Sequence, residues 1–204
     1  VCLKNLNINN YPKIIAVSKT FKIDKIKPLI DFGHIDFGEN KVQEAIDKWT
    51  EVKKKNSNIK LHMIGKLQSN KVKHAVKIFD FIHSLDNIKL AKKISEEQNK
   101  LKKNIKLFIQ INVGNENQKS GIKIEELKEF YITCTEKYKL KIIGLMCLPP
   151  LEKDPTIYFQ KMYKASRDLS LKELSMGMSS DYLTAVKYLS TYVRVGSSIF
   201  GQRS

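Results

Sequence analysis

Short apolar runs alternate with longer amphipathic segments along the chain. Runs typical of buried strands lie at residues 13–19, 35–38, 60–65, 81–85, 105–113, 141–148, 174–179 and 192–195. Between them lie segments with apolar positions at helical spacing and lysines on the opposite face, at residues 23–32, 41–54, 69–79, 88–102, 124–138, 156–171 and 182–191. No proline-, glycine- or serine-rich linker interrupts the alternation, so the pattern predicts a single domain over residues 1–204.

This order of elements predicts an α/β fold. Neighbouring parallel strands must be joined by crossover connections, which are usually helices. Eight strands separated by helices are what a (β/α)8 barrel, the TIM-like architecture, requires. A doubly wound open sheet is the alternative, because it uses the same alternation without closing.

The charge of the chain raises the question of a nucleic-acid partner. Lysine and arginine number 37 against 21 aspartates and glutamates, which gives a net charge of +16. The arginines, however, are only Arg167, Arg194 and Arg203, and the lysines are scattered over the expected helix faces. Because arginine makes the bidentate contacts favoured for bases and phosphates, this distribution argues against nucleic acid, and we expect none as a partner.

Cysteine usage and hydropathy bear on the compartment. Cys2, Cys134 and Cys147 are odd in number and lack metal-ligand spacing, so neither a disulfide framework nor a zinc site is expected. No apolar run approaches the roughly 20 residues that cross a bilayer. The first ten residues lack the hydrophobic core of a signal peptide. We therefore expect a cytoplasmic protein with no membrane partner.

In a barrel of this kind, functional residues lie where the strands end. Lys19 closes the first apolar run, and burial at such a position lowers the pKa of an amine and makes it nucleophilic. The alternative is a solvated lysine just past a strand. The seventh run ends at Ser179 and the eighth is followed by Gly196, at positions where a helical turn would begin and could bind phosphate.

These strand ends have plainer interpretations as well. Ser180 or Asp181 could be only a helix N-cap, Gly196 only a turn, and Arg194 an ordinary surface cation. Taken together, an amine, a phosphate cradle and a guanidinium on one face of a barrel predict a site for an aldehyde-bearing phosphate ester.

The order of motifs resembles that of the pyridoxal 5′-phosphate (PLP) homeostasis family, the YggS/PROSC-like proteins. The resemblance runs almost end to end, and its motifs include Ala16-Val17-Ser18-Lys19-Thr20, Phe37-Gly38-Glu39-Asn40, His62-Met63-Ile64-Gly65, Leu67-Gln68-Ser69-Asn70-Lys71, Lys119-Ser120-Gly121 and Val193-Arg194-Val195-Gly196-Ser197. The family is similar to the barrel half of bacterial alanine racemases, the fold-type III PLP architecture, without their second domain.

The resemblance implies PLP as the cofactor and assigns seven binding positions to it. Lys19 would form the internal aldimine, and Arg194 would face the pyridine nitrogen. The remaining positions are Ser179, Gly196 and Ser197 at the phosphate and Asn40 and Met178 near the ring. Ser175 opens its strand and has a structural interpretation instead, since side chains alternate sides along a strand.

The same residues favour holding PLP over catalysis. Arginine cannot accept a proton, so a ring nitrogen bonded to Arg194 stays unprotonated and the ring is a weaker electron sink. Racemisation also needs a second proton carrier, and we interpret His62 and His83 as packing or loop residues. The predicted function is therefore non-enzymatic. We expect a monomer that buffers PLP or delivers it to PLP-dependent apoenzymes, and that so influences amino-acid and keto-acid balance. A PLP-dependent amino-acid racemase, or a related fold-type III enzyme, is the alternative.

Overall fold

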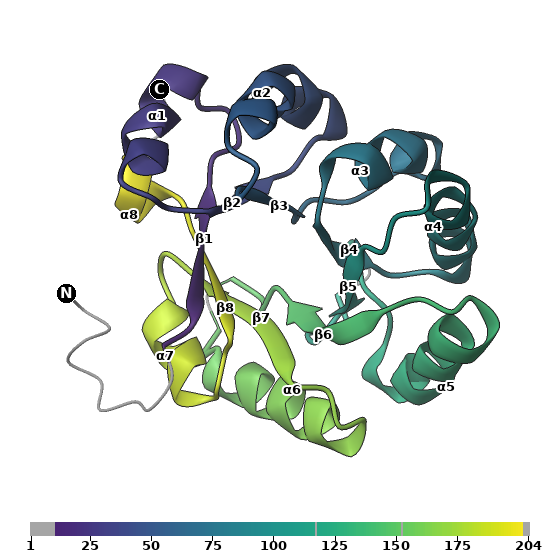
Figure 1. Cartoon of the computed structure of the whole chain (residues 1–204). Helices are drawn as coiled ribbons and strands as arrows, with labels where there is room; N and C mark the ends of the chain where they lie inside the picture. The colour runs from purple at the N-terminus through teal and green to yellow at the C-terminus, as the bar shows by residue number, and fades with distance from the viewer. Residues whose placement is uncertain (1–10, 117, 152, 202–204) are drawn as a thin grey trace.

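Eight parallel strands close into a barrel in the computed structural model, which describes residues 11–116, 118–151 and 153–201 (Figure 1). Their spatial order follows the sequence from β1 to β8, and β8 pairs back onto β1. The strands are β1 Lys13–Val17, β2 Asp36–Glu39, β3 Lys60–Met63, β4 Phe81–Leu85, β5 Lys106–Ile111, β6 Ile142–Cys147, β7 Glu173–Met178 and β8 Tyr192–Val195.

Helices surround the barrel and form its outer layer (Figure 1). The α-helices are α1 Ile23–Asp31, α2 Val42–Lys55, α3 Val72–Ile78, α4 Ile88–Leu101, α5 Leu127–Ile132, α6 Thr156–Asp168, α7 Tyr182–Lys187 and α8 Ser197–Phe200. Shorter turns of other helix types are η2 Ser69–Lys71 and η3 Ile124–Glu126, both 3₁₀, and η4 Thr133–Lys137, a π-helix.

Closure is visible in the pairing of β1 with β8. Ile15 pairs with Arg194 and Ala16 with Val195, in parallel register. The prediction of a (β/α)8 barrel is therefore confirmed. The doubly wound open sheet is wrong, because such a sheet leaves its two edge strands unpaired.

Side chains alternate between two cores along the strands. Those that point outward, such as Phe37 and Leu61, pack against the helices in the larger core. Those that point inward fill the barrel, where Ile15, Phe81 and Phe108 belong to a second cluster. Because the alternation fixes which face each residue lies on, it also decides which polar residues enter the barrel.

Element bounds differ from the predicted ones in several places. The expected helix 124–138 is divided into η3, α5 and η4, and the last expected helix ends at Lys187 instead of 191. A short helix, α8, follows β8. The first strand ends at Val17, two residues before Lys19, which lies in the following turn.

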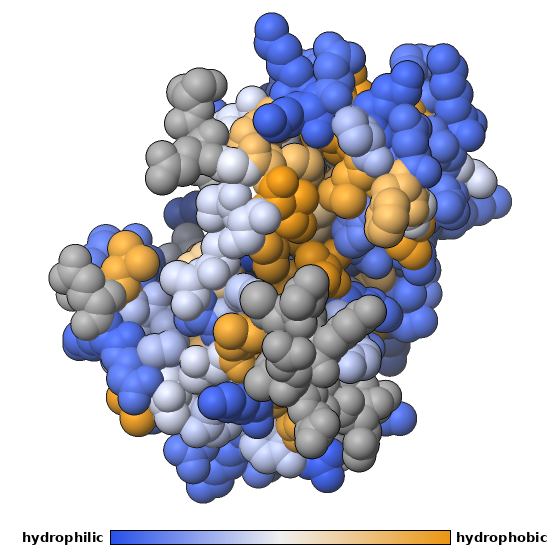
Figure 2. All heavy atoms as spheres, turned by 90° about the vertical axis from the view of Figure 1, so that its left-hand side faces the viewer, coloured by the Kyte–Doolittle hydropathy of each residue, from blue (hydrophilic) through white to orange (hydrophobic). Residues whose placement is uncertain are grey.

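The outer surface is largely polar. Figure 2 shows hydrophilic side chains over much of the face that carries α1, α7 and α8, with a smaller apolar region between them. Cys134 and Cys147 are buried free thiols, whereas Cys2 and Arg203 lie outside the described residues. Over the part of the chain that the structure describes, no helix has the length and apolar character that crossing a bilayer demands.

Candidate functional site

The structure brings together all seven residues that the resemblance implies. They line one cavity of about 430 Å³, here called the strand-end cavity, where β1, β2, β7 and β8 end. Its lining residues are Val17, Lys19, Phe21, Asn40, Ile64, Leu148, Met178, Ser179, Ser180, Arg194, Gly196, Ser197 and Gly201. The volume lies in the range of small-molecule sites.

Lys19 lies in a tight turn that is fixed on both sides. The amide of Ser18 continues the sheet by donating to the carbonyl of Gly38 at 3.0 Å. Thr20 has a φ of 68°, in the left-handed region, and its amide donates to the carboxylate of Glu44. These two hydrogen bonds hold the backbone of Lys19 at the mouth of the barrel. The Lys19 side chain is partly buried and lines the cavity.

A buried carboxylate supports this turn from behind. Glu39 is fully buried, and its Oε1 accepts hydrogen bonds from Ser18 Oγ at 2.7 Å and Trp49 Nε1 at 2.9 Å. Lys48 neutralises the charge with its amine 3.0 Å from the same oxygen. Lys48 also donates to the backbone carbonyl of Ser18 at 2.8 Å, which ties α2 to the residue that precedes Lys19.

Arg194 enters the cavity from β8 and is anchored to the barrel wall. Its Nη1 donates to the carbonyl and the hydroxyl of Ser175, both at 2.7 Å, and its Nη2 donates to the carbonyl of Cys147 at 2.9 Å. Burial lowers the pKa of the guanidinium, but arginine stays protonated in proteins. Of its five N–H donors, three are used within the described residues, and two remain for a ligand.

The ends of β7 and β8 meet across the cavity. The hydroxyl of Ser179 accepts a hydrogen bond from the amide of Gly196 at 3.3 Å. Asp181 is the N-cap residue of α7, as one sequence interpretation suggests, but its side chain makes no capping hydrogen bond and instead accepts from the amide of Met178 at 2.6 Å, which closes the turn after β7. Gly196 is the N-cap of α8, and the first amides of a helix, beginning here with Ser197, have no partner within it. The arrangement presents hydroxyl and amide donors to an anion.

Sequence reasoning missed the apolar walls and part of the rim of the cavity. These residues are Val17, Phe21, Ile64, Leu148, Ser180 and Gly201. The apolar members carry no chemical signal, and only closure of the barrel reveals that they meet. The sequence indicates Ser180 only as a possible helix N-cap.

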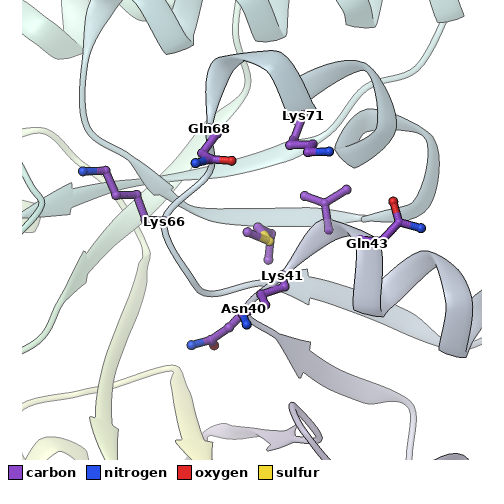
Figure 3. Close-up of a pocket in the computed structure, with 8 residues that line it drawn as sticks. Asn40, Lys41, Gln43, Lys66, Gln68 and Lys71 are labelled. Atoms are coloured by element: carbon purple, nitrogen blue, oxygen red, sulfur yellow. The ribbon is translucent and has the colours of Figure 1, made fainter.

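Asn40 is shared with a second, neighbouring pocket of about 310 Å³, here called the α2 pocket. Figure 3 shows Asn40 and Lys41 on one side of it, with Gln68 and Lys71 on the other. The Leu67-Gln68-Ser69-Asn70-Lys71 motif therefore contributes to this pocket and not to the strand-end cavity.

His62 and His83, here called the barrel histidines, lie inside the barrel and do not line the cavity. Their rings stack on Phe81 and Phe108, each with centroids 4.2 Å apart. Burial lowers the pKa of both, and that of His83 falls well below its usual value. Both rings pack in the interior of the barrel, in line with the sequence interpretation, and their lowered pKa values favour the neutral form.

This chain is similar in sequence and in structure to known proteins of one family. The alanine racemase N-terminal domain family matches residues 3–204. A pyridoxal phosphate homeostasis protein of Pasteurella multocida is 35% identical over 201 residues, covering 94% of this chain and 86% of the relative. The structure of PipY of Synechococcus elongatus with PLP bound superposes with a TM-score of 0.88 at 33% identity, covering 98% of this chain and 97% of PipY. An alanine racemase of Clostridium difficile shares the fold, with a TM-score of 0.74 at 14% identity, over 96% of this chain and 54% of the enzyme.

Proposed function

We propose that this chain, which belongs to the pyridoxal phosphate homeostasis proteins, binds PLP in the strand-end cavity. The observation that carries the proposal is the convergence of Lys19, Arg194 and the Ser179–Gly196 pair on one cavity of suitable size. We assign a single PLP-binding domain to residues 1–204.

The chemistry of the lining residues fits the parts of this cofactor. When bound, PLP supplies an aldehyde that condenses with an amine, so that a C=N bond forms and water leaves. Lys19 supplies the amine. For the phosphate, Ser179 supplies its hydroxyl and Ser197 its amide, while the amide of Gly196 donates to Ser179 Oγ and so orients that hydroxyl. Arg194 has N–H donors left that would bind the pyridine nitrogen, and Asn40 and Met178, which also line the cavity, would lie beside the ring.

Storage and delivery fit the ionisable groups better than catalysis does. Among the described residues that line the cavity, only Lys19 and Arg194 carry acidic or basic side chains. Arg194 cannot accept a proton, so a ring nitrogen bonded to it stays unprotonated and withdraws electrons weakly. Moving a proton between two faces of a substrate requires a second acid or base, which this lining does not supply.

We therefore infer that the protein acts as a monomer that holds PLP reversibly as a Schiff base. It buffers PLP or delivers it to PLP-dependent apoenzymes, and it thereby influences amino-acid and keto-acid balance. Racemisation is the second candidate, favoured by the shared fold with an alanine racemase of which this chain covers 54%.

Borohydride reduction followed by peptide mass mapping tests the binding proposal. Reduction converts the C=N bond into a stable secondary amine, so the PLP adduct should be found on Lys19. Lys19→Ala should lose the adduct and the visible absorption band. Lys22→Ala, which alters an exposed lysine three positions along, should keep both. An adduct on another lysine of the wild type, or none after incubation with PLP, would contradict the assignment.

Hydrogen exchange separates the two functional candidates. The loaded protein is incubated with amino acids in deuterated water, and exchange at the α-carbon is followed by proton NMR. A storage protein should leave the α-hydrogen in place. Rapid exchange that disappears in Lys19→Ala would support the racemase instead.

A further inference from the structure

A continuous chain of hydrogen-bonded side chains crosses the inside of the barrel. It runs from Asp36 Oδ1 to His62 Nε2 at 3.0 Å, from His62 Nδ1 to His83 Nε2 at 2.9 Å, and from His83 Nδ1 to Ser175 Oγ at 2.9 Å. Arg194 completes it by donating to Ser175 Oγ at 2.7 Å. These five residues, here called the polar chain, come from β2, β3, β4, β7 and β8, and each is at least 90% buried.

Only one arrangement of protons satisfies every member while both histidines are neutral. Arginine only donates and a carboxylate only accepts, so the two ends of the chain are fixed. His62 must carry its proton on Nε2 to donate to Asp36, which leaves its Nδ1 as an acceptor. His83 then donates from Nε2 and accepts on Nδ1, and the Ser175 hydroxyl donates to it. All hydrogen bonds therefore point in one direction, from Arg194 to Asp36.

The surroundings of the barrel histidines keep them in this neutral state. Both rings are fully buried, and Phe81, Phe108 and Tyr192 pack around them with centroids between 4.2 and 6.1 Å away. Burial is the main reason why the pKa of each lies below its usual value. Among the described residues, the side-chain hydrogen bonds of the two rings are those of the polar chain.

Charged groups act on the pair from both sides. Asp36 and Asp80 favour a proton on His62, whereas Lys13 disfavours it. Arg194 disfavours a proton on His83. A proton added to the pair therefore settles on His62, beside Asp36.

That proton would reverse part of the chain. His62 Nδ1 would then donate to His83 Nε2, and His83 would carry its own proton on Nδ1 and donate to Ser175. The Ser175 oxygen would face two donors, His83 and Arg194, and its hydroxyl hydrogen would turn away from His83. The anchor of Arg194 would change without any movement of the backbone.

We propose that Asp36, His62, His83 and Ser175 are positioning residues for the cofactor: through the polar chain they set the orientation and hydrogen bonding of Arg194 at the pyridine nitrogen. The proposal rests on the proposed function, because it takes PLP to be the ligand of Arg194. Through this chain, Asp36, which begins β2 at the end of the barrel opposite the cavity, would influence the electronic state of the bound pyridine ring.

The tautomers are measured first, by nitrogen NMR on histidine-labelled protein with and without PLP. At neutral pH both barrel histidines should carry a proton on Nε2 and none on Nδ1. A proton on Nδ1 of either ring would overturn the polarity of the chain. Because the signals exist without PLP, this result is independent of the proposed function.

His62→Phe then breaks the chain while keeping a ring to stack on Phe81. We expect about tenfold weaker PLP binding, the effect of losing one well-placed hydrogen bond. We also expect the absorption band to lose any shift with pH below about 6.5, the ordinary pKa of histidine, since burial moves the titration of this pair to lower pH. His74→Phe, the same substitution on the exposed face of α3, should match the wild type.

Ser175→Ala provides a milder break if His62→Phe fails to fold. It removes the hydroxyl but leaves the backbone carbonyl that Arg194 also uses, and it should weaken PLP binding and alter the pH profile in the same direction. Wild-type affinity and pH profile in folded His62→Phe or Ser175→Ala would overturn the proposal, even with PLP attached to Lys19. Failure of the wild type to bind PLP would instead overturn the proposed function.

Discussion

Replacing Lys48 with methionine would remove the cation that neutralises a fully buried carboxylate. The Lys48 amine lies 3.0 Å from Glu39 Oε1, and the exposed fractions of the two side chains are 9% and 0%. Glu39 Oε2 has no hydrogen-bond partner among the described residues, so Oε1 carries every contact. Methionine has a similar length to lysine and would leave the shape of the site nearly unchanged.

The expected loss of stability is about 3 to 5 kcal/mol, because breaking a buried ion pair from one side leaves an uncompensated charge. Trp49 and Ser18 still donate to the carboxylate, which favours the lower end of that range. The contact between Lys48 and Glu44, which is 25% exposed, adds little. In a protein of this size, a loss of about 3 kcal/mol lowers Tm by roughly 6 to 12 °C.

Urea unfolding followed by circular dichroism measures the effect, with two further variants. Lys54→Met makes the same substitution on the same helix in an exposed pair with Glu51, 66% and 73% exposed, and it should leave stability unchanged. Adding Glu39→Gln to Lys48→Met removes the stranded charge. The double variant should therefore be more stable than Lys48→Met alone.

Two results would contradict the expected role of the buried Glu39–Lys48 pair. One is a Lys48→Met protein within about 1 kcal/mol of Lys54→Met, which would show that the pair contributes no more than a surface contact. The other is a double variant no more stable than Lys48→Met. Since Lys48 also holds the carbonyl of Ser18, PLP binding by Lys48→Met should weaken at temperatures where the protein is still folded.

Three further outcomes follow from burial and close approach. Gly144→Ala should destabilise the fold by about 3 kcal/mol in urea unfolding, because a Cβ there would overlap a backbone carbonyl oxygen of β7. Gly33→Ala should cost only about 1 kcal/mol, because its Cβ would meet no atom within 4 Å and only the positive φ of 95° opposes it. Burial raises the pKa of Cys134 and Cys147 to about 12, so in a Cys2→Ser background a thiol reagent should label neither until urea unfolds the protein; rapid labelling of the native state would contradict this. Burial lowers the pKa of both barrel histidines, so below about pH 6.5 the unfolded state binds more protons than the folded state. The free energy of unfolding, measured in urea titrations, should therefore decrease as the pH is lowered below this value. Phenylalanine at both positions should flatten that slope, and an unchanged slope would mean that other groups cause it.

The periodicity of the chain was enough to predict the barrel but not every helix. Strand runs are short, apolar and bounded, so all eight were recognised. The segment from residue 124 to 138 has a continuous helical pattern, yet it forms 3₁₀, α and π turns in succession. Hydrophobic spacing does not distinguish these, because η3 and η4 are about one turn long, too short for their different periods to change the pattern of apolar positions.

The seven proposed binding residues could be chosen from the sequence, but the residues that hold them in place could not. Lys19 and Arg194 are recognisable because the family motifs place them at strand ends. The Glu39–Lys48 pair could not be found in this way, since it depends on how α2 packs behind β2. The polar chain joins residues from five strands, and its contacts exist only after the barrel has closed in the correct register.

Closure of β8 against β1 also has a consequence for the order of folding. Lys13 and Tyr192, which meet across this seam, are 179 positions apart. A ribosome-bound chain that has exposed only its first strands contains Lys19 without Arg194 or Gly196, and so cannot assemble the cavity. Contacts this distant in sequence form late and slow folding. Capture of PLP would then mark closure of the barrel, and PLP binding would stabilise closed barrels by a free energy that grows with the logarithm of its free concentration.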